Sequence, residues 1–291
     1  MQIIRAESLG MCFGVRDAIA LALDHAAAAP LTVLGDLVHN ATVPGEPEAK
    51  GAAVARHPSE VRTRAVMVTA HGASGRALHA TRRSGLDVVD ATCPLVHVAH
   101  RAVAALVRDG YHPVIVGQRA HVEVRGLTED LDDFDVVLDD EDVLKLTEHP
   151  RIGIAAQTTQ PVDRVARLVA LVRQRFPRSD VRFVDTVCKP TKQRQTAALE
   201  LARRADVIIV IGGRNSNNTR ELVTTCRRHC ARVHHVEIEA DLRSEWFHQT
   251  DTVGLTAGTS TPDTVIDRIE QRIREFAAEL VAVPAARSGE V

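Results

Sequence analysis

This chain of 291 residues has few aromatic residues and a net charge near zero. Aromatics make up 3% of it, with one Trp and one Tyr, so stacking platforms for nucleic-acid bases are not expected. The chain has 36 Lys and Arg residues and 38 Asp and Glu residues, and this balance argues against a broad basic surface that binds nucleic acid. No run approaches the roughly 18 apolar residues that a membrane helix needs. Neither nucleic acid nor membrane is therefore an expected partner.

A disulfide framework is also missing. The five cysteines are odd in number, widely spaced and free of any C-x-x-C pair, unlike those of a small secreted domain. The Ala-rich stretch 18–29 is interrupted by Asp24 and His25 and follows no basic segment, so it does not resemble a signal peptide. We expect a cytoplasmic protein whose thiols stay reduced.

Strand-like and helix-like segments alternate along the chain, which predicts an α/β fold with mostly parallel sheets. The most apolar strand is expected at 207–211, and helices are expected at 15–28, 96–108 and 162–176. The rhythm repeats in three blocks of similar size. We therefore predict three similar α/β domains over residues 13–93, residues 94–187 and residues 1–12 with 188–282, followed by a tail at 283–291.

Three cysteines follow predicted strands. Cys93 and Cys188 each end an Asp-x-x-Cys sequence with a proline just beyond, and Cys12 follows the opening apolar run. A single free cysteine is usually a buried apolar residue, so the repetition carries the prediction. Three thiolates without a fourth disfavour structural zinc and suit an iron-sulfur cluster with one iron open. Cys226 and Cys230, spaced i, i+4 on a predicted helix, are expected to be structural.

Polar side chains occupy the other predicted strand ends, where open α/β sheets bind ligands. Hydrogen bonding at the surface or in the core would explain each histidine alone, and helix capping would explain the 212–219 and 259–261 segments. Together these segments favour a diphosphate site. If its segment is extended, Glu123 lies on the same side as His121, and it would need a raised pKa to act as an acid. The candidates are His39, His71, His121, Glu123, Thr158, Ser216, Asn218 and Ser260.

Short motifs throughout residues 1 to about 280 resemble the LytB/IspH family of 4-hydroxy-3-methylbut-2-enyl diphosphate reductases. They occur in the order of the family, which makes the set far more specific than any one of them. They are Cys12-Phe13-Gly14-Val15, Val38-His39-Asn40, Ala70-His71-Gly72, Asp90 to Pro94, His121 with Glu123-Val124, Gln157-Thr158-Thr159, Asp185 to Cys188 with Arg194-Gln195, Asn215 to Thr219, and Ala257 to Ser260.

The resemblance implies a pseudo-threefold trefoil of α/β domains around a 4Fe-4S cluster held by Cys12, Cys93 and Cys188. It also implies reductive dehydroxylation of (E)-4-hydroxy-3-methylbut-2-enyl diphosphate to isopentenyl and dimethylallyl diphosphate, the last step of the methylerythritol phosphate route to isoprenoids. Catalytic roles fall to Glu123, His121 and Thr158, and diphosphate binding to His39, His71, His121, Ser216, Asn218 and Ser260. Because no dinucleotide fingerprint is present, ferredoxin or flavodoxin is the expected electron donor.

The sequence departs from the family pattern in three places. Pro44, Gly45 and Pro47 interrupt a segment that is usually helical. Val122 and Gly75 stand where proline is common. A paralogous iron-sulfur reductase or dehydratase acting on another phosphorylated substrate is the main alternative. An iron-sulfur redox sensor and a metal-free phosphosugar-binding protein are the others.

Overall fold

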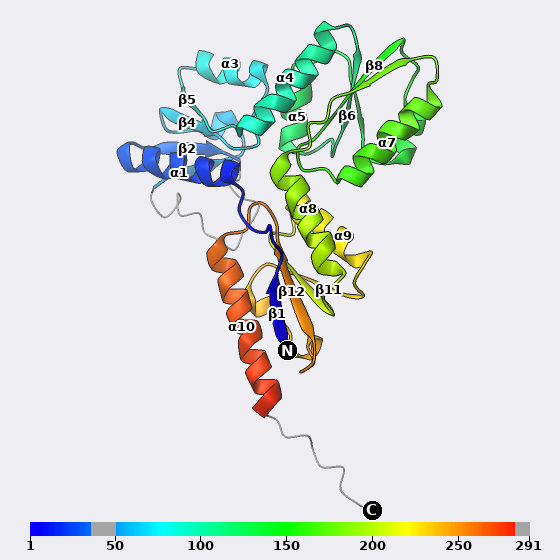
Figure 1. Cartoon of the computed structure of the whole chain (residues 1–291). Coiled ribbons are helices and arrows are strands. Elements are labelled where there is room, and N and C mark those ends of the chain that lie inside the picture. The colour runs from blue at the N-terminus through cyan, green and yellow to red at the C-terminus, as the bar shows by residue number, and fades with distance from the viewer. Residues whose placement is uncertain (36–50, 283–291) are drawn as a thin grey trace, which may run out of the picture. The chain divides into compact units, whose positions relative to one another are not determined.

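A computed structural model describes residues 1–35 and 51–282 (Figure 1). His39 and the segment with Pro44, Gly45 and Pro47 lie outside the described residues, so their predicted roles stay predictions. Within the described ranges, no helix combines the length and the apolar content that crossing a membrane requires.

The first sheet is formed by residues 31–90. Its strands are all parallel and lie in the order β3-β2-β4-β5. The elements are α1 (Phe13–Ala28), β2 (Leu31–Leu34), β3 (Ala53–Ala55), η1 (Pro58–Glu60), β4 (Ala65–Val68), α3 (Gly75–Arg83) and β5 (Asp87–Asp90). The central strands are apolar because both of their faces are covered: Leu31, Val33 and Met67 are fully buried and pack with Ala18 and Ala22 of α1.

The second sheet repeats this construction in residues 112–183, with strand order β7-β6-β8-β9. The elements are α4 (Pro94–Arg108), β6 (His112–Val116), α5 (Val122–Thr128), β7 (Asp135–Val137), α6 (Asp140–Lys145), β8 (Arg151–Ala156), α7 (Val162–Arg175) and β9 (Asp180–Phe183). One face of β6 and β8 packs on α7 and the other on α4 and α5.

The third sheet combines the two ends of the chain, in the order β1-β12-β10-β11. The elements are β1 (Gln2–Arg5), α8 (Lys189–Ala202), β10 (Val207–Ile211), α9 (Asn217–Arg227), β11 (Arg232–Val236), η2 (Glu239–Asp241), η3 (Ser244–Trp246), β12 (Thr252–Ala257) and α10 (Asp263–Ala282). All five residues of β10 are fully buried. Figure 1 shows β1, in blue, running beside β12, in orange.

All three sheets share one strand order. Counting strands along each repeat, the order is second, first, third, fourth, and β1 takes the fourth place in the third sheet. Each fourth strand leads into a cysteine: β5 into Cys93, β9 into Cys188 and β1 into Cys12. The first and third strands, which neighbour each other, lead into the predicted histidine, glutamate, threonine and serine positions. In every sheet, therefore, the cysteine follows the fourth strand and the other candidate residues follow the two neighbouring first and third strands.

The predicted α/β fold with three parallel sheets is confirmed. The described residues form two compact units: the larger unit contains residues 12–35 and 51–192, and the smaller unit contains residues 1–11 and 193–282. The three domain boundaries predicted from the sequence stay a prediction.

The segment of Glu123 is helical rather than extended, because residues 122–128 form α5, so the condition for placing Glu123 and His121 on the same side of a strand is not met. Helix α8 begins at Lys189 and contains Pro190, which is tolerated in a first helical turn.

Candidate active site

The three strand-end cysteines occupy equivalent positions at helix N-termini in the larger unit. Cys12 is the N-cap of α1, Cys93 is the N-cap of α4, and Cys188 directly precedes α8. Each backbone carbonyl accepts a hydrogen bond from the residue four positions on, at 3.1 Å. All three side chains are partly buried. A helix N-terminus favours a negative charge, which suits thiolate ligands.

The thiols are also electrostatically coupled. Burial raises the pKa of both Cys93 and Cys188, and Cys12 and Glu123 raise both pKa values further by charge repulsion. These four groups therefore lie near one another. A metal centre would offset the cost of three buried thiolates by supplying positive charge.

The distances between the sulfurs distinguish a single bound metal ion from a cluster of several. A single zinc ion bound at about 2.3 Å brings its sulfur ligands to about 4 Å from one another. Among the described residues, Cys12, Cys93 and Cys188 are not a group whose ligand atoms all lie within 4.8 Å. At least one pair of these sulfurs is therefore farther apart than one zinc ion would hold it, whereas a cluster of several metal ions can bind thiols at a wider spacing.

Gly14 allows the segments of Cys12 and Cys93 to approach each other. A Cβ atom built on Gly14 would lie 2.5 Å from Sγ of Cys93, closer than any side chain tolerates. The glycine after Cys12-Phe13 is therefore required by contact with the second cysteine.

A chain of hydrogen bonds connects Cys188 with Glu123. The N–H of Cys188 donates to the carbonyl of Thr158 at 3.0 Å. The N–H of Thr158 donates to Oε1 of Glu123 at 2.6 Å, and its hydroxyl donates to Oε2 at 3.0 Å. Thr158 thus fixes the Glu123 carboxyl relative to the cysteine segment.

Glu123 lies in the first turn of α5, and its carboxyl is withdrawn from solvent. Its exposed fraction is 1%. Burial raises its pKa to about 7, although both hydrogen bonds from Thr158 act to lower it. A carboxyl group with this pKa can hold and release a proton near neutral pH, as general acid chemistry requires.

His121 is the N-cap of α5. Its Nδ1 accepts a hydrogen bond from the N–H of Glu123 at 3.1 Å, which places the proton of a neutral ring on Nε2. The ring of His71 meets the ring of His121 edge to face, with centroids 5.6 Å apart. The positive φ of +76° at Gly72 directs the chain away after His71, and a Cβ atom there would meet Thr92 at 3.0 Å. The structure therefore places the rings of His71 and His121 in contact.

The segment after His71 is joined to the C-terminal end of α5 by a group of contacts that we call the Asp130 clasp: Ser74, Gly75, Arg76, Glu129 and Asp130. The N–H groups of Gly75 and Arg76 donate to the Asp130 carboxylate at 2.6 and 2.8 Å, which caps α3. The hydroxyl of Ser74 donates to Glu129 at 3.0 Å. Proline at position 75 could not donate, so this departure from the family pattern adds a hydrogen bond.

The smaller unit holds Ser216, Asn218 and Ser260 at the ends of the neighbouring strands β10 and β12. Ser216 is the N-cap of α9 and accepts from the N–H of Thr219. Oδ1 of Asn218 accepts from the N–H of Thr259 at 3.0 Å, which links the two loops. Nδ2 of Asn218 and Oγ of Ser260 are buried without a hydrogen-bond partner. Because an unpaired buried polar group costs about 1–3 kcal/mol, these atoms suit an anionic ligand.

Comparison with known proteins decides the family. The family model described as "LytB protein" matches residues 3–274. The chain belongs to the LytB family. It is 39% identical over 276 residues to the 4-hydroxy-3-methylbut-2-enyl diphosphate reductase of Geobacter sp. (strain M21), covering 94% of this chain and 97% of that relative. The enzyme of the same name from Aquifex aeolicus (strain VF5) is 35% identical, with 95% and 97% covered.

Solved structures agree with this assignment. One, described as (E)-4-hydroxy-3-methyl-but-2-enyl diphosphate reductase, the terminal enzyme of the non-mevalonate pathway, aligns with a TM-score of 0.68 and 34% identity over 94% of this chain and 99% of that one. The E-1-hydroxy-2-methyl-but-2-enyl-4-diphosphate reductase from Plasmodium falciparum aligns with a TM-score of 0.85 and 26% identity, covering 97% and 89%. The LytB family resemblance predicted from the motifs is confirmed.

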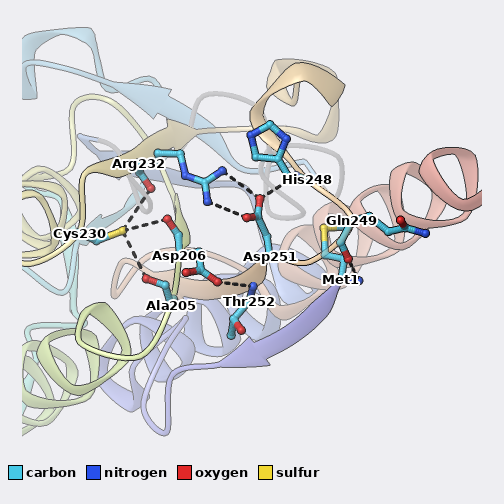
Figure 2. Close-up of polar contacts among 9 residues, drawn as sticks. All are labelled: Met1, Ala205, Asp206, Cys230, Arg232, His248, Gln249, Asp251 and Thr252. Atoms are coloured by element: carbon cyan, nitrogen blue, oxygen red, sulfur yellow. Dashed lines mark hydrogen bonds and ion pairs between the residues drawn. The ribbon is translucent and has the colours of Figure 1, made fainter. Parts of the chain in front are cut away.

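The two remaining cysteines of this LytB family chain have a structural environment. Cys226 is fully buried in an apolar cluster, and burial raises its pKa to about 12. Figure 2 shows the sulfur of Cys230 among the backbone carbonyls of Ala205, Asp206 and Arg232, at 3.5–3.6 Å. A thiol can donate to these carbonyl oxygens, so the surroundings of Cys230 are those of a structural cysteine.

One other group of potential metal ligands occurs among the described residues: His112, Asp135 and His149. It lies at the ends of strands β6 and β7 remote from Glu123. The two imidazole rings stack in parallel, with centroids 3.7 Å apart. Nε2 of His112 is hydrogen-bonded to Asp135 at 2.9 Å. The stacked rings and the hydrogen bond to Asp135 make this a polar cluster whose His112 side chain is only 8% exposed.

Gln157 is a site residue whose role sequence reasoning missed. It is fully buried between the loops after β6 and β8. Its Oε1 accepts from the N–H of Gln118 at 3.1 Å and from the side chain of Gln160 at 3.0 Å. Its place beside Thr158 in the Gln-Thr-Thr motif was the available signal.

Proposed function

We propose that this chain, an oxidoreductase of the LytB family, converts (E)-4-hydroxy-3-methylbut-2-enyl diphosphate to isopentenyl and dimethylallyl diphosphate. The observation that carries the proposal is the buried Glu123 carboxyl, with a pKa of about 7 and a hydrogen-bonded link through Thr158 to Cys188. The names of the curated relatives supply the substrate.

The cofactor in this proposal is a 4Fe-4S cluster bound by Cys12, Cys93 and Cys188. Their placement at three helix N-termini supports it. Such a cluster, with one iron free of protein ligands, supplies electrons and a Lewis acid at the same place.

Glu123 is the proposed proton donor. The reaction replaces the C–OH bond of the substrate by C–H, consumes two electrons and two protons, and releases water. Protonated Glu123 supplies a proton to the departing hydroxyl group, and the Thr158 hydroxyl, 3.0 Å from Oε2, orients the carboxyl. Since the Glu123 side chain is 1% exposed, bulk water does not compete for this proton.

The diphosphate is proposed to bind His39, His71, His121, Ser216, Asn218 and Ser260. The proton on Nε2 of His121 can donate to a phosphate oxygen, because Nδ1 already accepts from Glu123. The unpaired Nδ2 of Asn218 and Oγ of Ser260 are further donors. A diphosphate would relieve the cost of burying both groups.

The proposed electron donor is a ferredoxin or a flavodoxin, since no dinucleotide-binding fingerprint occurs in the sequence. The proposed location is the cytoplasm, where thiols stay free to bind iron.

Anaerobic turnover tests the proposal. Cluster-loaded protein is supplied with the hydroxylated diphosphate and a chemical reductant, and the products are separated by chromatography. We expect both isoprenoid diphosphates from wild type and neither from Cys93→Ser, whose brown colour should weaken or disappear. A colourless, iron-free wild type, or a loaded protein that forms no product, contradicts the proposal.

A further inference from the structure

Thr191 places a hydroxyl beside one of the three proposed cluster ligands. Its Oγ1 lies 3.1 Å from Sγ of Cys188. Thr191 is in the first turn of α8 and is fully buried, so water cannot replace the sulfur as its partner. The short distance and the burial make this contact a fixed part of the Cys188 environment.

The other two cysteines lack an equivalent group. The residue three positions after each cysteine is Val15 for Cys12, Val96 for Cys93 and Thr191 for Cys188. Valine and threonine have nearly the same shape, but only threonine carries a hydroxyl. The repeated fold thus presents the same position three times and provides a side-chain donor only once.

The direction of the hydrogen bond depends on the state of the sulfur. A thiol can donate its proton to the Thr191 hydroxyl. A thiolate bound to iron has no proton, so the hydroxyl must then donate to the sulfur.

We propose that the Thr191 hydroxyl donates a hydrogen bond to the Cys188 thiolate, strengthens that thiolate as a ligand and raises the reduction potential of the cluster. The inference rests on the proposed function, because it requires the cluster. An added electron increases the negative charge on the ligand sulfurs, so a donor to sulfur stabilises the reduced form more than the oxidised form. Thr191 is a positioning residue, since it acts through Cys188.

The test is a redox titration of cluster-loaded protein under argon, followed by electron paramagnetic resonance. Thr191→Val places a valine three positions after Cys188, as already occurs after the other two cysteines. We expect the equilibrium constant for one-electron reduction to fall about tenfold, which lowers the reduction potential by about 59 mV. Thr191→Ser keeps a hydroxyl and should keep the wild-type potential. Thr81→Val is the matched control, because Thr81 is a buried helical threonine whose hydroxyl donates to the Ala77 carbonyl.

Each outcome decides the matter. An unchanged potential in fully loaded Thr191→Val overturns the inference, as does an equal shift in Thr81→Val. If Thr191→Val and Thr191→Ala lose iron while Thr191→Ser keeps it, the hydroxyl is needed to stabilise the thiolate ligand, as inferred; iron loss from Thr191→Ser as well overturns it. If the wild-type protein binds no cluster, the proposed function is contradicted as well. If the wild-type protein is active but Thr191→Val leaves the reduction potential unchanged, only the role of Thr191 is contradicted.

Discussion

The raised pKa of Glu123 predicts a specific dependence of the reaction rate on pH. With a pKa of about 7, roughly nine-tenths of the carboxyl groups carry a proton at pH 6 and roughly one-tenth at pH 8. If protonated Glu123 is the acid, wild-type turnover should fall about ninefold over this interval. Glu123→Gln preserves the shape but cannot deliver a proton, so turnover should drop by about 10²–10⁴ and lose this pH dependence.

The measurement is steady-state product formation at saturating substrate and reductant between pH 6 and 8. Iron content is determined for each sample, so that activity is expressed per loaded cluster. Glu141→Gln is the control, since it makes the same change on the exposed face of α6. Full activity in Glu123→Gln, or a flat wild-type profile, would remove Glu123 from the role of proton donor.

Three further predictions concern stability and binding. The Glu123 pKa is raised from 4.5 to about 7, so the contribution of this group to stability is present below pH 4.5 and lost as the pH rises through 7. The free energy of unfolding of Glu123→Gln should therefore exceed that of wild type by up to about 3 kcal/mol at pH 8 and by little at pH 5. Denaturant unfolding at both pH values checks this. Gly75→Pro should lower stability by about 1–2 kcal/mol because it removes the donor to Asp130; thermal unfolding checks this against Gly75→Ala, which keeps the N–H. Ser260→Ala should raise KM about tenfold or more without lowering the thermal midpoint, because its hydroxyl has no partner in the protein; a loss of stability with unchanged KM would contradict the assigned role.

The fold was largely predictable because the strands are short apolar runs that alternate with helices. The positions of Cys12, Cys93 and Cys188 were predictable for a related reason, since each follows a strand. Helix α5 was not, because Val122-Glu123-Val124 alternates apolar and polar residues as a strand does. The helix forms because His121 caps it and because Val124 and Leu127 are buried in the second sheet's core.

The electrostatics of the site could not be predicted from the sequence either. The requirement for a raised Glu123 pKa could be stated, but its cause is burial, which depends on residues far along the chain. The Asp130 clasp likewise connects residues about 55 positions apart. Such pairings become visible only when the sheets are assembled.

The third sheet has a consequence for the order in which the molecule is made. Gln2 pairs with Thr252, so β1 leaves the ribosome early but cannot take its place in the sheet until β12 has been synthesised. Strand pairing across so many residues is slow, because a long loop must close first. β1 therefore joins its sheet last, whereas β5 and β9 pair with strands that precede them in the chain. A protein truncated before β12 would leave β1 without its partner strand, while Cys12 would still cap α1, which packs on the first sheet.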